Sequence, residues 1–368
     1  MTTPALQRLR EKFPQARIGL LTQEKLADLW QCHPSVDDVI TFSPGDTVWS
    51  VASTIRRFQV CDQKGASFDL GLILPNSPRS ALEFWVAGIP RRIGYAKPWR
   101  SWMLTERIAV RSGHVTMHKR SRREIKQLVR REKKEAIKEI SAVSHQIYDY
   151  LHLTSVLGAN SDPVAPHLFI SDEEVEACEK RWLADARDKG LTPSGERPVT
   201  FLGVNPAAAY GPAKRWPVEN FAAVVREVSR RIQDCVWLAV GGKEDAKLCE
   251  QIAASGGGHV LNLAGKTSLR ELMALLKLCR VLLTNDSGPM HIAAALGTRV
   301  VVAFGSTAPE LTGPGLTNDS QHYLLKADAP CSPCFRRTCP IDLRCMRGIS
   351  VPSMVEAVLS SASRTVKR

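Results

Sequence analysis

The segment TNDSGPMHIAAALG, residues 284–297, lies between two elements of predicted secondary structure. An apolar run typical of a buried strand precedes it, a helix pattern of small residues begins inside it, and a second apolar run follows it. Strand, helix and strand in this order predict a parallel sheet, because two parallel strands need a crossover connection. Ligands bind such sheets beyond the carboxyl ends of the strands, so residues 286–288 occupy a position suited to a ligand.

The same alternation continues along the chain of 368 residues, a length that favours two domains over one. The Gly-, Pro- and Ser-rich stretch LTPSGERP, residues 191–198, is the best candidate for the boundary. We therefore expect an α/β protein with two Rossmann-like domains, residues 1–190 and 191–368, the first with a basic helical insertion at about residues 118–139. Six strands are predicted in the second half, at residues 199–204, 236–240, 260–263, 281–284, 300–304 and 322–325.

Composition restricts the class of partner. The formal net charge of +13 and the pI of about 9.4 indicate an anionic partner. We expect no nucleic-acid partner, because aromatic residues make up 6% of the chain and no known nucleic-acid-binding motif is present. No apolar stretch approaches the ~20 residues that span a bilayer, and the N-terminus lacks the apolar core of a signal peptide. The expected location is the cytoplasm, either free or peripheral to a membrane.

Residues 286–288 combine two kinds of ligand contact. The backbone N–H groups of Ser287 and Gly288 lie at a helix start, where the helix dipole also favours a phosphate. Gly288 lets the backbone approach a ligand closely. Asp286 would repel a phosphate and is better suited to accept hydrogen bonds from sugar hydroxyls. The alternative is that Ser287 caps the helix while Asp286 and His291 are structural.

Two further loops follow predicted strands. GVNPAAAYGPAKRWP, residues 203–217, is well suited to surround an anion, and its Lys214 is the candidate contact to a diphosphate. In GGKED, residues 241–245, Glu244 or Asp245 could hold a ribose diol. The alternatives are an ordinary solvated lysine and acidic residues that favour a helix start through its dipole.

The segment CSPCFRRTCPIDLRC contains four clustered cysteines, Cys331, Cys334, Cys339 and Cys345. A CxxC pair followed by two more thiols can form a Zn²⁺ or an Fe–S site. Reduced structural thiols and an adventitious disulfide are the alternatives, the latter disfavoured in a reducing cytosol.

Together these motifs resemble the ADP-heptose:lipopolysaccharide heptosyltransferases of glycosyltransferase family 9. The resemblance is carried by DSGPMHIAAALG with FGSTAPELTGP, by NPAAAYGPAKRWP, LAGKTSL and PCSPC…CP…CM, and by LPNSPRSALEFWVAGIPRRIGY in the first half. It implies a GT-B fold, in which the N-terminal domain binds the acceptor and the C-terminal domain the nucleotide sugar. It further implies an inverting enzyme that moves heptose from ADP-L-glycero-D-manno-heptose to the lipopolysaccharide inner core of a Gram-negative bacterium, without a required cofactor.

The resemblance also implies roles for the residues singled out above. Lys214 and the backbone of Ser287 and Gly288 would hold the diphosphate, while Asp286 would contact the heptose and His291 would support its loop.

On the nucleoside side, Glu244 or Asp245 would bind the ribose and Thr267 would lie beside the adenine. The catalytic residue is unknown, because family members carry their general base in a Gly-Asp loop just upstream of a TTPAL-like helix start. Met1 falls inside that motif. We therefore expect either a start site upstream of Met1 or an impaired product.

The implied acceptor is a phosphorylated lipid A–Kdo–heptose in the inner membrane. The basic helix at residues 118–139 suits this acceptor and peripheral contact with the membrane, or it is simply a solvated face with i,i+4 ion pairs. Two alternatives to the leading function remain: a family 9 enzyme with another donor or acceptor, and a catalytically silent protein that binds a sugar nucleotide.

Overall fold

The computed structural model describes residues 1–60, 68–131, 140–192, 199–257, 259–316 and 319–363. Their contacts divide the chain into two units. Unit 1 comprises residues 1–114 and 143–164, and unit 2 comprises residues 115–142 and 165–368. This division differs from the predicted boundary near residue 191, because both the basic segment and the helix that follows Ser171 pack on unit 2.

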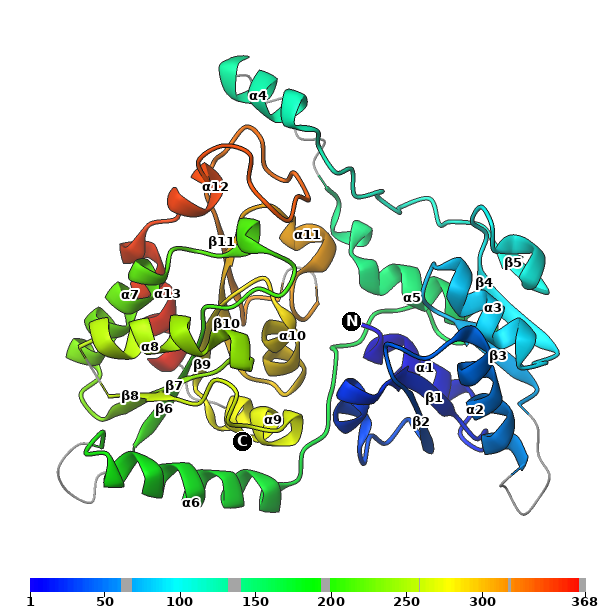
Figure 1. Cartoon of the computed structure of the whole chain (residues 1–368), viewed down its shortest axis with the longest axis horizontal. Helices are drawn as coiled ribbons and strands as arrows, with labels where there is room; N and C mark the ends of the chain where they lie inside the picture. The colour runs from blue at the N-terminus through cyan, green and yellow to red at the C-terminus, as the bar shows by residue number, and fades with distance from the viewer. Residues whose placement is uncertain (61–67, 132–139, 193–198, 258, 317–318, 364–368) are drawn as a thin grey trace. The chain divides into compact units, whose positions relative to one another are not determined.

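Unit 2 is built on a six-stranded parallel sheet with the strand order β11-β10-β9-β6-β7-β8 (Figure 1). Its strands are β6 (Thr200–Asn205), β7 (Cys235–Ala239), β8 (Val260–Asn262), β9 (Val281–Asn285), β10 (Arg299–Phe304) and β11 (Tyr323–Lys326). All six agree with the predicted strands to within one residue. Successive strands β6, β7 and β8 extend to one side, and β9 then pairs with the other side of β6. The topological switch point, where doubly wound sheets bind ligands, therefore lies between β6 and β9.

Helices cover both faces of this sheet (Figure 1). One face carries α7 (Val218–Arg231), α8 (Ala246–Ser255) and α13 (Val351–Ser363), and the other carries α9 (Leu269–Leu278) and α10 (Gly288–Ala295). Burial on both faces explains why β7 and β9 are continuous apolar runs instead of alternating sequences. Trp237 of β7 and Phe221 of α7 are fully buried in the resulting core.

Helix α6 (Asp172–Asp188) belongs to unit 2 because it packs along α9. Its start is set by a capping box between Ser171 and Glu174. Trp182 is buried on its inner side, and Glu174 forms an ion pair with Arg270 of α9.

The described part of unit 1 contains five strands in two parallel sheets. The strands are β1 (Gly19–Gln23), β2 (Asp38–Phe42), β3 (Leu70–Ile73), β4 (Arg91–Tyr95) and β5 (Glu106–Ile108). Its described helices are α1 (Thr3–Lys12), η1 (Glu24–Trp30), α2 (Val48–Val60), α3 (Pro78–Val86), η2 (Ser101–Met103) and α5 (Gln146–Ser155). The short helix η3 (Ala142–Ser144) begins at the last residue of a unit 2 segment and continues into unit 1. Strand β1 pairs with β2, and β3, β4 and β5 pair in that order.

The short elements of unit 2 are η4 (Pro212–Lys214), η5 (Lys243–Asp245), α11 (Pro309–Thr312) and α12 (Arg344–Arg347).

The basic helix α4 (Arg122–Arg131) is shorter at its start than the predicted range, and residues 132–139 lie outside the described residues. Ser121 ends the preceding extended segment, because its hydroxyl accepts the Glu124 N–H at 3.2 Å while the Glu124 carboxylate accepts the Ser121 N–H. The apolar side of α4 includes Ile125, which is buried against the cysteine-rich segment of unit 2.

Replacing Ile125 with aspartate is expected to release α4 from unit 2, because the carboxylate would be buried among apolar side chains. Trypsin should then cleave faster at the arginines of α4, as measured by mass spectrometry over a time course. Gln127→Asp makes the same charge change at an exposed position of the same helix. Equal cleavage rates in the two variants would show that Ile125 does not hold the helix.

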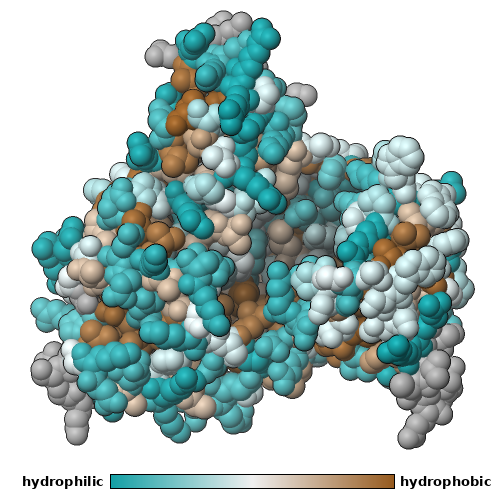
Figure 2. Space-filling view, viewed as in Figure 1, coloured by the Kyte–Doolittle hydropathy of each residue, from teal (hydrophilic) through white to brown (hydrophobic). Residues whose placement is uncertain are grey.

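The visible surface is mostly hydrophilic, including much of the surface over α4 (Figure 2). Among the helices of the described residues, none has both the length and the apolar character needed to cross a membrane.

Candidate functional site

Two loops meet at the switch point of the unit 2 sheet, and one buried side chain joins them. Asn285, the last residue of β9, donates from Nδ2 to the Pro206 carbonyl oxygen at 2.8 Å. Its Oδ1 accepts the Trp216 N–H at 2.9 Å. Both contacts lie in the loop that follows β6, so Asn285 holds that loop against the end of β9. Trp216 is itself buried, with its ring edge-on to Phe221 at 5.1 Å between centroids.

Lys214 and Asp286 form an ion pair across these two loops, with Nζ 2.6 Å from Oδ2. The Lys214 side chain is 13% exposed and that of Asp286 is 5% exposed. The Thr307 hydroxyl, which follows β10, donates to the same carboxylate oxygen at 2.5 Å. The structure therefore brings together the two side chains that the sequence assigned to the diphosphate and to the sugar.

Helix α10 begins beside this pair, with Gly288 as its first residue. Ser287 precedes it in an extended conformation, and its hydroxyl lies 3.1 Å from Thr284 Oγ1. Since that hydroxyl is turned toward β9, the alternative that Ser287 caps the helix with its side chain does not hold. A Cβ on Gly288 would meet open space, and His291 lies one turn further along the partly exposed side of α10. The amide groups at this helix start can thus approach an anion.

The residues predicted for the nucleoside follow β7 and β8. Glu244 is exposed, whereas Asp245 is buried and accepts the Gly242 N–H at 3.0 Å. Asp245 therefore stabilises its own loop, and Glu244 is the better candidate for a ribose. The loop that carries Thr267 lies against the loop at residues 241–245, since the Gly265 N–H donates to the Gly241 carbonyl oxygen at 3.0 Å.

Two residues at the site, Tyr210 and Arg337, were not predicted from the sequence. Lys214 Nζ lies 4.9 Å from the centroid of the Tyr210 ring, and Arg337 Cζ lies 5.3 Å from it. The Tyr210 hydroxyl donates to the Phe335 carbonyl oxygen at 2.9 Å. Gly211 has a φ of 148°, and a Cβ there would lie 2.5 Å from the Arg337 carbonyl oxygen. The cysteine-rich segment thus packs directly on the loop that carries Lys214.

The metal interpretation of Cys331, Cys334, Cys339 and Cys345 is not supported. Within the described ranges, no three His, Cys, Asp or Glu side chains are placed to share one metal ion. All four cysteines are free, and Cys331 and Cys334 are buried against Ile125 of α4. Burial raises the pKa of the Cys345 thiol to about 12, and it raises the pKa of the Cys331 and Cys334 thiols as well. The thiols of Cys331, Cys334 and Cys345 are therefore protonated at neutral pH and act as small apolar groups.

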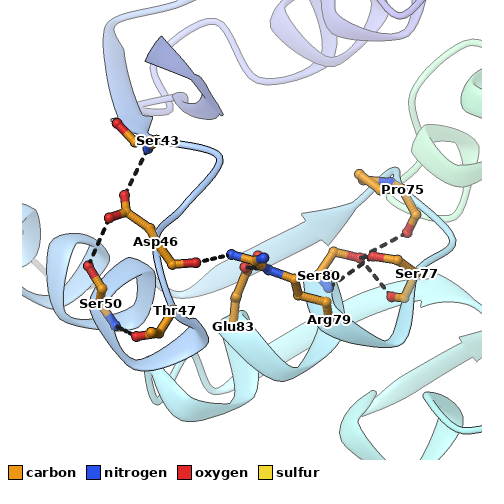
Figure 3. A network of polar contacts seen from close by, with 9 residues as sticks. All are labelled: Ser43, Asp46, Thr47, Ser50, Pro75, Ser77, Arg79, Ser80 and Glu83. Atoms are coloured by element: carbon orange, nitrogen blue, oxygen red, sulfur yellow. Dashed lines mark hydrogen bonds and ion pairs between the residues drawn. The ribbon is translucent and has the colours of Figure 1, made fainter.

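Unit 1 carries a polar network where β2 and β3 end (Figure 3). Arg79 donates to the Asp46 carbonyl oxygen at 2.5 Å and to Glu83 at 2.8 Å. The Asp46 carboxylate accepts the Ser43 N–H at 2.8 Å, and Ser80 is bonded to the capping residue Ser77 at 3.1 Å. The Asp46 carboxylate thus stabilises the start of α2, where it also accepts the Ser50 hydroxyl at 3.4 Å.

A family model described as glycosyltransferase family 9 (heptosyltransferase) matches residues 62–344, well over half of the chain. The chain belongs to this family. Among family 9 relatives, lipooligosaccharide heptosyltransferase 2 of Haemophilus ducreyi is 27% identical over 322 residues, which cover 85% of this chain and 82% of that protein. Lipopolysaccharide heptosyltransferase 2 of Escherichia coli is 27% identical over 320 residues, covering 85% and 81%. The family assignment made from the motifs is therefore confirmed, and the protein is a glycosyltransferase.

Solved structures of family 9 share the fold. The E. coli ADP-heptose lipopolysaccharide heptosyltransferase II matches with a TM-score of 0.70 at 22% identity, covering 98% of this chain and 94% of that chain. A family 9 glycosyltransferase from Veillonella parvula matches with a TM-score of 0.75 at 20% identity, covering 98% and 92%. These likenesses confirm the predicted GT-B fold.

Proposed function

We propose that this protein transfers heptose from ADP-L-glycero-D-manno-heptose to the inner core of lipopolysaccharide, with inversion at the anomeric carbon. The names of its family 9 relatives support the class of donor and acceptor. The observation that carries the proposal is the Lys214–Asp286 pair beside the start of α10, at the switch point of the sheet.

The diphosphate of the donor lies between the Lys214 ammonium and the backbone amides of Ser287 and Gly288. Both groups stabilise the negative charge that grows on the departing ADP as the bond to the sugar breaks. Asp286 remains hydrogen-bonded to Thr307 and accepts a hydrogen bond from a hydroxyl of the heptose. The carboxylate of Glu244 accepts hydrogen bonds from the ribose hydroxyls, and Thr267 lies beside the adenine.

The reaction forms one bond and breaks one. An acceptor hydroxyl attacks the anomeric carbon from the face opposite ADP, its proton passes to a general base, and ADP leaves with the bonding electrons. No residue of the described chain is assigned as that base.

Binding of ADP is the first test of this proposal. ADP should raise the unfolding temperature, and UDP and GDP should raise it less. At about 100 times the dissociation constant, a ligand adds ~2.7 kcal/mol to the free energy of unfolding. An equal shift with all three nucleotides would contradict recognition of adenine.

Release of ADP in the presence of a lipid A–Kdo₂–heptose acceptor tests the transfer itself. Turnover that needs both ADP-heptose and acceptor supports the enzyme. Donor binding without ADP release would instead support the alternative of a silent sugar-nucleotide-binding protein.

The acceptor also places the protein at the cytoplasmic face of the inner membrane. This location is supported by four exposed basic residues of α4: Arg122, Arg123, Lys126 and Arg130. Anionic lipids attract such a cluster by about 1 kcal/mol per basic residue.

A further inference from the structure

Unit 1 exposes three tryptophans that are close together in the chain or in contact. Trp85, near the end of α3, is 45% exposed, and Trp102, in η2, is 60% exposed. Their rings meet edge to face, with centroids 5.4 Å apart. Trp99 lies in the turn that leads directly into η2 and is 85% exposed. Tryptophan is largely buried in most proteins, so a group of three exposed indoles indicates a surface that contacts something else.

The turn is constructed to keep these indoles outside. Arg100, next to Trp99, is fully buried and donates to the Pro75 carbonyl oxygen at 2.6 Å. Met103 and Leu104 are buried in the core of unit 1. The smaller apolar side chains of this segment are therefore used for packing, while its two largest face solvent.

The backbone of the turn is held in one conformation. The Lys97 N–H donates to Ser101 Oγ at 3.2 Å, and that hydroxyl donates to the Lys97 carbonyl oxygen at 2.9 Å. Trp99 has a φ of 64°, in the left-handed region that side chains rarely adopt. Such strain persists where the surrounding structure imposes it, and it is often found at functional sites.

The surroundings of the indoles are cationic. Residues 75–110 contain six basic residues and two acidic ones. Both acidic residues are already paired, Glu83 with Arg79 and Glu106 with Arg91.

Arg107 is exposed and donates to the Ser101 carbonyl oxygen at 3.0 Å, which places its guanidinium at the residue that precedes Trp102 in η2. Lys97 lies two residues before Trp99 and is partly exposed. Two copies of a surface with this charge would repel each other, so charge complementarity favours an anionic partner over self-association. Indoles flanked by lysine and arginine are the residues that anchor proteins at the headgroup level of a bilayer.

We propose that Trp85, Trp99 and Trp102, with Lys97 and Arg107, form a tryptophan platform that inserts into the interfacial region of an anionic phospholipid bilayer. The reason for the protein to meet a membrane rests on the proposed function, but the contact itself does not require transfer of a sugar.

Co-sedimentation with vesicles tests the platform. The protein should bind vesicles that contain phosphatidylglycerol and bind pure phosphatidylcholine vesicles less. The double substitution Trp99→Ser with Trp102→Ser should weaken binding to the anionic vesicles by on the order of tenfold or more. The reason is that two indole rings are no longer transferred from water into the interfacial region of the bilayer. Trp49→Ser is the matched control, since Trp49 is 68% exposed but lies on α2, outside the platform.

The basic residues of the platform give a second variant. Lys97→Ala with Arg107→Ala should reduce binding to anionic vesicles and leave binding to phosphatidylcholine unchanged. An unchanged ADP thermal shift shows that each variant is folded, so loss of vesicle binding with retained ADP binding supports the platform alone.

Three results would overturn the proposal. The first is vesicle binding by the Trp99/Trp102 variant at the wild-type level. The second is equal loss in the Trp49→Ser control. The third is a wild-type dimer in sedimentation that only the double variant abolishes, since it would identify a second copy as the occupant. If ADP produces no thermal shift while the tryptophan variants keep the wild-type unfolding temperature and lose vesicle binding, the proposed function fails and the platform stands.

Discussion

Replacing Lys214 with alanine is expected to weaken ADP binding roughly 10–100-fold, because one charge-assisted contact to the diphosphate is lost. The kcat/KM for transfer should fall further, by on the order of 10²–10³-fold, as expected for a group that stabilises charge developing on the leaving ADP. Isothermal titration with ADP and steady-state rates of ADP release measure the two effects.

Loss of Lys214 also changes the environment of its ion-pair partner, Asp286. Asp286 is almost completely buried, and without Lys214 its carboxylate retains the Thr307 hydroxyl but loses the ammonium group that offsets its repulsion of an incoming phosphate. Adding Asp286→Asn to the Lys214→Ala variant should therefore recover part of the ADP affinity. That recovery would show that the two side chains act on one ligand.

Lys247→Ala serves as the control, since Lys247 is an exposed lysine of α8 in the same unit. It should leave ADP affinity unchanged. Equal affinities for ADP in the wild type and in Lys214→Ala would remove the basis of the proposed donor site.

Replacing Asn285 with alanine is expected to lower the free energy of unfolding by about 2–6 kcal/mol. The substitution leaves two buried groups unpaired, the Pro206 carbonyl and the Trp216 N–H, and each costs roughly 1–3 kcal/mol. ADP affinity should fall as well, because the loop that carries Lys214 is no longer held to β9. Urea unfolding with an unchanged m-value measures the first effect.

Asn285→Asp tests the direction of the hydrogen bonds. It keeps an oxygen for the Trp216 N–H but replaces the donor to Pro206 with a buried carboxylate, so it should destabilise more than alanine. Asn160→Ala is the control at an exposed position. An unfolding free energy for Asn285→Ala within about 0.5 kcal/mol of the wild type would contradict the role of this side chain.

The strand ends and the helix starts of unit 2 could be read from the chain because their signals are local. Apolar runs of five or six residues predict strands buried on both faces, and Ser287-Gly288-Pro289 predicts the start of α10 beside a strand end. The six predicted strands therefore lie within one residue of the observed ones. The apolar runs of unit 1 are shorter, and β5 contains only three residues.

The errors have physical causes of a different kind. The length of the basic segment predicted a helix from His118, but the Ser121–Glu124 capping interaction starts it at Arg122. The unit on which this helix packs could not be predicted, because Ile125 is buried by residues more than two hundred positions later in the chain. The same packing gives Cys331 and Cys334 an apolar environment, whereas their spacing alone also suited a metal.

By itself, the sequence determined the family, the doubly wound α/β architecture and the loops that carry the residues proposed to bind the donor, because each depends on short patterns of apolar, glycine and proline residues. Only the tertiary structure decided how those loops are joined. Lys214 meets Asp286 across 72 positions, and Asn285 meets Trp216 across 69. Neither contact has a local signal, since both arise when the parallel pairing of β6 and β9 brings two strand ends to the same edge of one sheet.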